Sequence, residues 1–524
     1  MYTSCILNEG WLEGKPLGLR IGEEREDMAR RYDVVVVGGG NAAFCAAQAA
    51  RERGARVILL EKAPEGWLGG NSYFTAGAFR VTFGGLDDLR PLLHESDEEM
   101  LSRTELPPYT AEDFMSDMER VTEGRCDPHL AGIMVEESGD IARWLRDKGI
   151  RWRLMYDRQA FEVDGRLRFW GGLVLGTVGG GKGLIEQHLA SARRSGVEVR
   201  CSFAVKRLLR DHSGAVVGVE GEGPEGLEAV EAGAVVLACG GFESSAEMRS
   251  RHLGPQWAAA KVRGTPYNTG EGLEMALEVG AEPYGDWSGC HSIAWDAAAP
   301  PTGDRKLTNR YSKQSYPLGI VVNSEGRRFL DEGADFRNYT YARYGAEILR
   351  QPGGVAYQLF DAKTEPLLRK DEYDAPGVSR FQAGSIGELA DHMRVDREGL
   401  ERTVREFNAA VRPGRFDPSV KDGKRTEGIE PPKSNWALPL DTPPYYGFAV
   451  TCGITFTFGG LHVDGDARVL DTSRRPIPGL HAAGELVGGL FYHNYPGGSG
   501  LTSGAVFGRR AGHAAAAFAG GRAG

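Results

Sequence analysis

The stretch Asp33–Lys62, which reads DVVVVGGGNAAFCAAQAARERGARVILLEK, carries the strongest fold signal in this chain. An apolar run, Val34–Val37, leads into the glycines Gly38 to Gly40, and a second apolar run ends at Glu61. This order predicts a strand, a tight turn, a helix and a second strand that ends in a carboxylate. A glycine-rich turn lets backbone N–H groups approach a pyrophosphate at a helix N-terminus, and a carboxylate about 20 residues later accepts hydrogen bonds from a ribose. The sequence therefore predicts a dinucleotide site, in which Ala43 replaces the third glycine of the fingerprint and still permits close helix packing.

The composition is that of a large acidic chain with neither nucleic-acid nor membrane signals. A formal charge of −10 leaves no basic excess for nucleic acid, and the seven cysteines form no C-x-x-C pair, so no metal or iron–sulfur ligand set is predicted. The alanine-rich end, His513–Phe518, is far shorter than a membrane span. The start of the chain is polar and acidic and does not resemble a signal peptide. We therefore expect a cytoplasmic protein whose partners are small molecules and proteins.

Changes of pattern divide the chain into four predicted parts. These are an N-terminal extension without a folding pattern (1–30), the first part of a dinucleotide-binding domain (31–286), a capping domain (287–451) and the C-terminal part of the first domain (452–524). Helical spacing covers Glu112–Lys148, and strand patterns at Ala204–Leu209 and Ala215–Glu220 predict an antiparallel excursion before Ala234–Ala238 returns to the main sheet. The predicted fold class is α/β, with a discontinuous Rossmann-like domain and an inserted α+β capping domain.

Several further blocks resemble the flavoproteins of the fumarate reductase and succinate dehydrogenase superfamily, and the resemblance covers nearly the whole chain after Arg31. Beside the opening fingerprint, the blocks are Gly69–Ser72 with Ala76-Gly77, Ala238–Phe242, Asn268–Gly272, Ala483–Glu485 and Gly497–Gly500. In such families each block contacts FAD or shapes its pocket. The resemblance thus implies that the dinucleotide is FAD rather than NAD, and that the Rossmann-like domain is an FAD-binding domain.

The resemblance also implies how FAD is held. Members with covalent flavin have a histidine where Asn71 stands, so noncovalent FAD is expected, with Glu61 on the adenosine ribose and Asn71 and Ser72 near the isoalloxazine. Glu485 is expected on the ribityl side. The full set of expected cofactor contacts is Gly38, Gly40, Asn41, Ala42, Glu61, Lys62, Gly70, Asn71, Ser72, Gly77, Val205, Gly240, Gly484, Glu485, Gly500 and Leu501.

For catalysis, the resemblance points to Arg337 in the phrase Asp335–Tyr339. In fumarate reductases a corresponding arginine delivers a proton to the substrate, and Asp335 or Glu332 is expected to act as its relay because a guanidinium is an unusual acid or base. The alternative is a surface ion pair. His291 falls where the family has a carboxylate-binding histidine, and its alternative is a packing role.

Two departures from the family argue against fumarate or succinate as substrate: Tyr495 stands where a second arginine is usual, and Phe456 replaces a histidine. The phrases Gly66–Ser72, Asp331–Tyr339 and Gly488–Tyr495 most resemble tricarballylate dehydrogenases. This implies conversion of tricarballylate to cis-aconitate, with a proton lost beside a carboxylate, a hydride passed to flavin N5, and electrons passed to a separate iron–sulfur protein at the membrane. Candidate partners for the trianion are Arg337, His291, Lys313, Arg310, Arg343, His493 and Tyr495.

Three alternatives stay open at this point. One is a 3-ketosteroid or other cyclic-ketone dehydrogenase, for which Tyr495 and Tyr492 are suitable. Another is a fumarate-reductase-like alkene reductase, because the residues do not fix the direction of the reaction. The third is a flavin-carrying electron-transfer subunit without its own substrate. Location is likewise open between a free cytoplasmic protein and one held at the inner face of the membrane through its electron acceptor.

Overall fold

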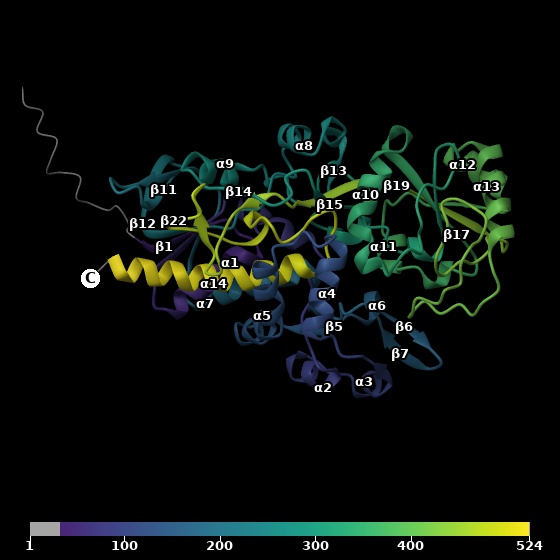
Figure 1. The fold of residues 1–524 in the computed structure, drawn as a ribbon, viewed down its shortest axis with the longest axis horizontal. Helices are drawn as coiled ribbons and strands as arrows, with labels where there is room; N and C mark the ends of the chain where they lie inside the picture. The colour runs from purple at the N-terminus through teal and green to yellow at the C-terminus, as the bar shows by residue number, and fades with distance from the viewer. Residues whose placement is uncertain (1–31, 523–524) are drawn as a thin grey trace, which may run out of the picture.

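A computed structural model describes residues 32–522, so the predicted extension at 1–30 lies outside the described residues. Figure 1 shows two regions along the long axis of the molecule. One contains the first strands and the long C-terminal helix α14 (Ser499–Arg522), and the other ends in the helices α12 (Ile386–Met393) and α13 (Arg397–Ala410).

The first region is built on a parallel sheet in the strand order β9-β2-β1-β12-β22. Val34 pairs with both Val57 and Ala234, so the strand of the opening fingerprint lies in the middle of the sheet. Residues 34–37 and 57–60 are buried, as expected for parallel strands covered on both faces. The strand bounds are β1 (Tyr32–Val37), β2 (Val57–Leu60), β9 (Glu198–Arg200), β12 (Gly226–Leu237) and β22 (Pro476–Ala482).

The predicted antiparallel excursion is confirmed. Strands β10 (Ala204–Arg210) and β11 (Val216–Gly223) form a meander with the first half of β12. The second half of β12 then pairs in parallel with β1, so this long strand joins the excursion to the main sheet.

Helix α1 (Asn41–Glu52) follows the glycine turn and packs closely on α14. A Cβ added to Gly508 would lie 2.6 Å from the carbonyl oxygen of Ala42, and one added to Gly512 would overlap the carbonyl of Ala46. Glycine every fourth residue on α14 therefore allows the close approach of the two backbones. This contact places the C-terminal helix α14 against the first helix of the chain, α1, as expected for a domain built from both ends of the chain.

The second region contains a six-stranded sheet in the order β13-β19-β17-β16, with β15 and β18 also on β19. Helices α12 and α13 cover it through a separate apolar core that includes Leu389, Leu400 and Phe407. The sheet begins at Lys261 and ends at Thr457, so it uses residues on both sides of the predicted 287–451 insert. The strand bounds are β13 (Lys261–Val262), β15 (Cys290–Asp296), β16 (Ile320–Asn323), β17 (Val355–Asp361), β18 (Phe381–Ala383) and β19 (Tyr445–Thr457).

The predicted helix over Glu112–Lys148 is two helices, α4 (Ala111–Val121) and α5 (Pro128–Asp147). Glu123 and Gly124 both have positive φ, and Asp127 caps the second helix ahead of Pro128. The helix therefore ends and a new one begins here, although the spacing of apolar residues continues across the break. The remaining helices are α2 (Leu86–Leu89), α3 (Glu98–Arg103), α6 (Tyr156–Gln159), α7 (Gly180–Arg194), α8 (Ala246–His252), α9 (Glu271–Glu278), α10 (Tyr341–Leu349) and α11 (Lys370–Tyr373). The remaining strands are β3 (Ala78–Phe79), β4 (Thr104–Glu105), β5 (Trp152–Leu154), β6 (Ala160–Val163), β7 (Arg166–Phe169), β8 (Leu175–Thr177), β14 (Pro283–Tyr284), β20 (Gly460–Leu461) and β21 (Arg468–Leu470).

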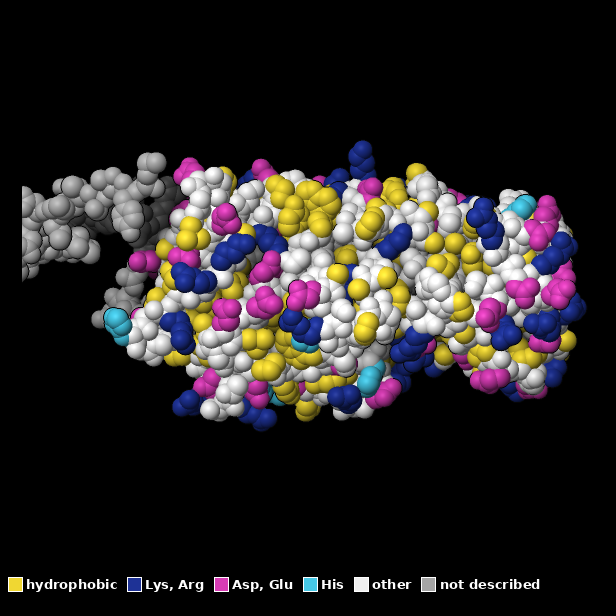
Figure 2. All heavy atoms as spheres, turned by 90° about the horizontal axis from the view of Figure 1, so that it is seen from above, with side chains coloured by type: hydrophobic (Ala, Val, Ile, Leu, Met, Phe, Trp, Pro, Cys, Tyr) yellow, Lys and Arg dark blue, Asp and Glu magenta, His cyan; other side chains and the backbone are white. Residues whose placement is uncertain are grey.

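The surface in Figure 2 mixes acidic and basic side chains over the visible face, with apolar side chains between them. Within residues 32–522, no helix has both the length and the apolar character needed to cross a membrane. Over the same range, no cluster of His, Cys, Asp and Glu side chains is arranged to hold a metal ion.

Candidate active site

A single cavity gathers residues from both regions, and all the expected cofactor contacts except Gly77 line it. Gly77 lies behind the wall, where an added Cβ would overlap the hydroxyl of Thr177 and come 2.7 Å from the backbone of Gly180. Its role is therefore packing beneath the cavity.

The glycine turn Gly38–Gly40 forms part of the cavity wall. Gly38 has φ of +115°, and an added Cβ would lie 2.7 Å from the carbonyl carbon of Ala238. Gly40 precedes α1 and supplies no side-chain cap. The N–H of Asn41 donates to Ser72, so the next N–H of the helix, that of Ala42 in the cavity wall, is left for a ligand. This arrangement fits a pyrophosphate, because helix N-termini attract anions.

Glu61 lies at the end of β2, as the sequence predicts. The backbone N–H of Ala63 donates to its carboxylate at 2.7 Å, while burial raises its pKa. Lys62 also lines the cavity, but its ammonium is engaged by Glu271 at 2.7 Å and Thr269 at 2.6 Å. The Glu61 carboxylate can accept hydrogen bonds at this point of the wall, and its expected contact with a ribose stays a prediction.

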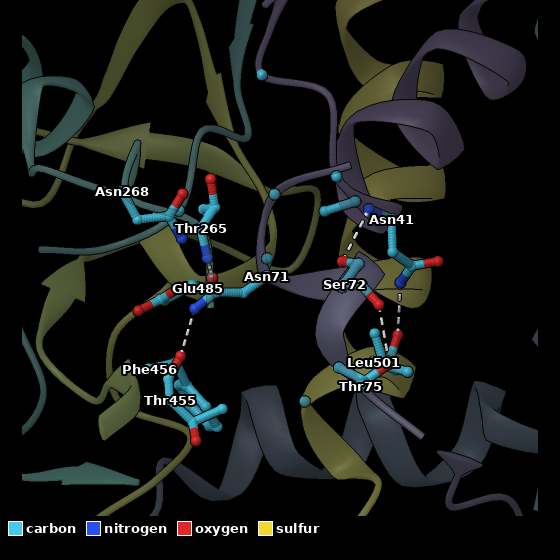
Figure 3. A pocket seen from close by; sticks show the side chains of 18 of the residues that line it. Asn41, Asn71, Ser72, Thr75, Thr265, Asn268, Thr455, Phe456, Glu485 and Leu501 are labelled. Carbon is cyan, nitrogen blue, oxygen red and sulfur yellow. Dashed lines mark hydrogen bonds between the residues drawn. The ribbon is translucent and has the colours of Figure 1, made fainter. Parts of the chain in front are cut away.

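Figure 3 shows the side chains of Asn71 and Ser72 pointing apart, Asn71 toward Thr265 and Thr455 and Ser72 toward Asn41. The Asn71 amide donates to the carbonyl of Thr455 at 2.5 Å and accepts from the N–H of Thr265 at 2.8 Å. Ser72 accepts from the backbone N–H of Asn41 at 3.1 Å. These hydrogen bonds within the protein hold both side chains in place without a ligand.

Arg337 is only 6 % exposed and lines the same cavity. Its guanidinium donates to the side-chain oxygens of Gln314 at 2.8 Å and Gln159 at 3.1 Å. Burial, together with the guanidinium groups of Arg369 and Arg158, holds the pKa of Arg337 well below its usual range.

The structure does not bring the expected relay carboxylates to Arg337. Asp335 pairs with Arg120 at 2.5 Å, and Glu332 pairs with Arg328 at 2.5 Å. Both carboxylates are neighbours of Arg337 in sequence only: the chain turns and bends over residues 332–335, and each carboxylate pairs with another arginine.

Two further arginines of the cavity wall, Arg158 and Arg263, were missed by the sequence reasoning. Arg263 donates to Asn309 at 2.9 Å and to the hydroxyl of Thr455 at 3.0 Å, and burial lowers its pKa. Arg158 is instead paired with two carboxylates, that of the buried Glu372 and that of Asp371 at 2.7 Å. The only feature of the sequence that could have indicated Arg263 as a cavity residue is its position just before the Asn268–Gly272 block.

Tyr495 lines the cavity and shares a hydrogen bond of 2.6 Å with the hydroxyl of Tyr341, another residue that was missed. Burial and the Tyr341 hydroxyl raise the pKa of Tyr495 well above its usual value. Tyr492, the other tyrosine considered, is not part of the cavity lining.

Three expected catalytic residues do not line the cavity. His291 is fully buried behind Phe456 and Tyr495, with ring centroids 5.4 Å and 4.7 Å away, and burial holds its pKa well below the usual value. Lys313 is buried and lies 3.4 Å from the carboxylate of Asp296.

His493 is half-exposed near Arg125 and Glu123. The other candidate cations, Arg310 and Arg343, are also outside the lining.

Comparison with known proteins identifies the wider group. The model of the family described as "FAD binding domain" matches residues 33–501. The chain is 30% identical to "Fumarate reductase (cytochrome)" of Shewanella frigidimarina, covering 93% of this chain and 77% of the relative. It is 28% identical to "4-oxocyclohexanecarboxylate 2-dehydrogenase" of Sinomonas cyclohexanicum, covering 89% of each.

Among solved structures, the open conformation of a flavocytochrome c3 fumarate reductase matches with a TM-score of 0.70 at 28% identity. That match covers 93% of this chain and 78% of the other. The fold class predicted from the sequence is confirmed, and so is FAD as the cofactor. The chain belongs to the FAD binding domain family and is an FAD-dependent oxidoreductase of the fumarate reductase group that acts on CH–CH bonds.

Proposed function

We propose that the protein dehydrogenates a CH–CH bond beside a carboxylate, with conversion of tricarballylate to cis-aconitate as the leading reaction. One observation carries the proposal. The guanidinium groups of Arg263 and Arg337 are buried in the wall of one cavity, and neither pairs with a carboxylate anywhere in residues 32–522.

Burying an unpaired charge is costly, and a bound anion offsets that cost through charge-assisted hydrogen bonds. Gln314, Gln159 and Asn309 are neutral, so they orient the two guanidinium groups without cancelling their charge. Arg158 adds a third guanidinium to the lining, already paired with Asp371. A cavity with two guanidinium groups that form no ion pair, and a third nearby, suits a di- or tricarboxylate better than a neutral ring.

Bound FAD supplies the hydride acceptor for this class of reaction. The chain supplies the proton acceptor, which we assign to Arg337. The neutral form of its side chain accepts the substrate proton and becomes the guanidinium cation, and the lowered pKa of Arg337 makes that neutral form accessible. In the opposite direction Arg337 delivers the proton to an alkene, so a fumarate-reductase-like activity would use the same residues. The flavin potential and the electron partner decide the direction.

The FAD is proposed to be noncovalent, because the Asn71 amide is held by Thr265 and Thr455 and has no atom suited to a covalent flavin bond. Denaturation in trichloroacetic acid should release all the yellow colour into the supernatant. Colour that stays with the pellet would contradict noncovalent binding.

We further propose that electrons pass to a separate carrier protein, of the iron–sulfur type implied by the resemblance, at the inner face of the membrane. The word "cytochrome" in the name of the Shewanella relative supports transfer to a one-electron centre in that protein. The proposal predicts that membranes from the source cell accept electrons from the substrate-reduced protein.

The direct test of the substrate proposal is dye-linked turnover on tricarballylate, succinate, a cyclic 4-oxo acid and a 3-ketosteroid. Tricarballylate should give the highest kcat/KM, and Arg337→Gln should reduce turnover by roughly a thousandfold while FAD stays bound. Turnover on the ketosteroid alone would overturn the proposal.

A second candidate is a cyclic-ketone dehydrogenase, and the Tyr341–Tyr495 hydroxyl pair favours it. A tyrosine pair can polarise a carbonyl and assist proton removal beside it. The Sinomonas relative is named for a substrate that combines a ketone with a carboxylate, a combination that suits a cavity with both tyrosines and arginines. Under this reading Tyr495→Phe abolishes turnover of the cyclic 4-oxo acid, whereas under the first reading it changes tricarballylate turnover by less than about tenfold.

A further inference from the structure

Two glutamates of the cofactor region, Glu243 and Glu485, bring their carboxyl groups together beside the cavity. Glu243 follows β12 and is 0 % exposed, while Glu485 lies in the short turn Gly484–Leu486 and lines the cavity. In Figure 3, Glu485 lies on the same side of the cavity as Asn71 and Asn268. Glu243 was not among the residues that the sequence singled out.

The hydrogen bonds show what each carboxyl does. One oxygen of Glu243 accepts from the amide of Asn71 at 2.5 Å and from that of Asn268 at 2.6 Å. Its other oxygen is buried and has no hydrogen-bond partner among the described residues, and the side chain of Glu485 lies within hydrogen-bonding reach of the Glu243 carboxyl. Glu485 accepts from the backbone N–H of Thr457 at 2.7 Å and from its hydroxyl at 3.1 Å.

Between residues 32 and 522, no cation pairs with either carboxylate. Arg249 approaches Glu243 but donates at 2.5 Å to its backbone carbonyl, and to the backbone of Trp257 at 2.8 Å. Lys62 is paired with Glu271. The pair therefore has only neutral donors around it.

Two carboxylates in contact and shielded from water do not both ionise, because the charges repel and neither is solvated. Burial and the charge of Glu485 raise the pKa of Glu243 well above its usual value, and burial raises that of Glu485. Glu243 is the more buried of the two carboxyls and has a free oxygen, so a proton that it carries can be donated to Glu485.

We propose that Glu243 is a positioning residue for FAD: it holds one shared proton, donates it as a hydrogen bond to Glu485, and so fixes Glu485 and Asn71 toward the cofactor. Loss of this proton turns the pair into two repelling carboxylates and weakens FAD binding. The proposal does not depend on the identity of the substrate.

The test measures FAD dissociation from the purified holoenzyme, by the fluorescence of released flavin, from about pH 6 to about pH 9. For the natural protein, the dissociation constant should rise on the order of tenfold over this range. Glu243→Gln is the informative variant, because its amide oxygen accepts from Asn71 and Asn268 and its amide N–H₂ donates to Glu485 without any shared proton. This variant should bind FAD normally at the lower pH and keep its affinity at the higher pH.

The control is Glu162→Gln, which removes an exposed carboxylate paired with Arg103 and should keep the pH dependence of the natural protein. Thermal unfolding of the same proteins checks folding. Because the folded-state pKa of Glu243 is raised, the natural protein loses stability as pH rises from the ordinary glutamate value through the raised one, and Glu243→Gln should remove that loss. An unchanged pH dependence in folded Glu243→Gln, or weakened FAD binding at every pH, would overturn the proposal.

Discussion

The cofactor side and the substrate side of the cavity are built by different means. Around Gly38 and Gly40 the wall is backbone, and at Gly38 no side chain fits because an added Cβ would overlap the backbone of Ala238. Around Arg263 and Arg337 the wall is long side chains held by neutral amides from distant parts of the chain. The first kind of wall is determined by a few consecutive residues, whereas the second requires the whole fold.

The largest effect is expected on the backbone side. Gly38→Ala should abolish FAD binding, because the residue has φ of +115° and the new Cβ would overlap the backbone of Ala238 and Cys239. The flavin content of purified protein measures this. Gly226→Ala is the matched control, since Gly226 has φ of +109° but nothing within 4 Å of an added Cβ. Equal flavin loss in both variants would mean that backbone strain alone is responsible.

On the side-chain side, Arg337→Gln should leave FAD bound and reduce turnover by roughly a thousandfold, because it removes the proposed proton acceptor. Arg337→Lys keeps a charge but loses the forked contacts to Gln314 and Gln159, so it should recover only part of the activity. Rapid-quench or stopped-flow flavin reduction measures the chemical step directly. A rate of flavin reduction equal to that of the natural protein in Arg337→Gln would exclude the proposed role.

A smaller effect is expected for Arg263→Gln. This guanidinium is proposed to anchor a substrate carboxylate without taking part in proton transfer, so KM should rise about tenfold to a hundredfold with a lesser change in kcat. Arg415→Gln, which removes an exposed ion pair with Asp164, is the control and should match the natural protein. A fall in kcat with constant KM would instead place Arg263 in the chemical step.

The smallest effect concerns the capping region alone. Lys433 is buried and donates to the carbonyls of Pro317 at 2.8 Å and Gly319 at 2.5 Å, and burial lowers its pKa to about 8. Because the pKa of Lys433 is lower in the folded state than in the unfolded state, the free energy of unfolding should increase by about 1 kcal/mol between about pH 7 and about pH 9. Lys433→Met should lack this gain in chemical denaturation, while its FAD affinity stays that of the natural protein. An identical pH dependence in the variant would show that another group is responsible.

The sequence predicted the backbone side of the cavity well. A strand, a glycine turn and a helix are consecutive, so Val34 to Glu61 could be assigned from spacing alone, and the family blocks added Asn71, Gly240 and Glu485. The exception is Gly77, which packs against Thr177 and Gly180 outside the cavity lining. A glycine in a motif indicates that another group comes close to the backbone, but the sequence does not show whether that group is the cofactor or the protein.

The substrate side was predicted less completely. Arg158, Arg263 and Tyr341 come from separate segments, and no local pattern shows that they share a cavity with Arg337. Lys313 and His493 had the right chemistry but point elsewhere: the ammonium of Lys313 is taken by Asp296, and His493 stays near the surface. The insert boundaries at 287 and 451 stay a prediction, since the sheet of that region begins at Lys261 and ends at Thr457.

The central claim is that two buried guanidinium groups without an ion-pair partner, in the wall of the FAD cavity, select a polycarboxylate. Anaerobic titration of the oxidised holoenzyme with tricarballylate, followed by absorbance of the flavin, tests it most directly. The account predicts that tricarballylate bleaches the flavin, and that Arg337→Gln binds the acid, seen as a spectral shift, without bleaching. Bleaching by a neutral cyclic ketone, with no spectral response to any di- or tricarboxylate, would contradict the account.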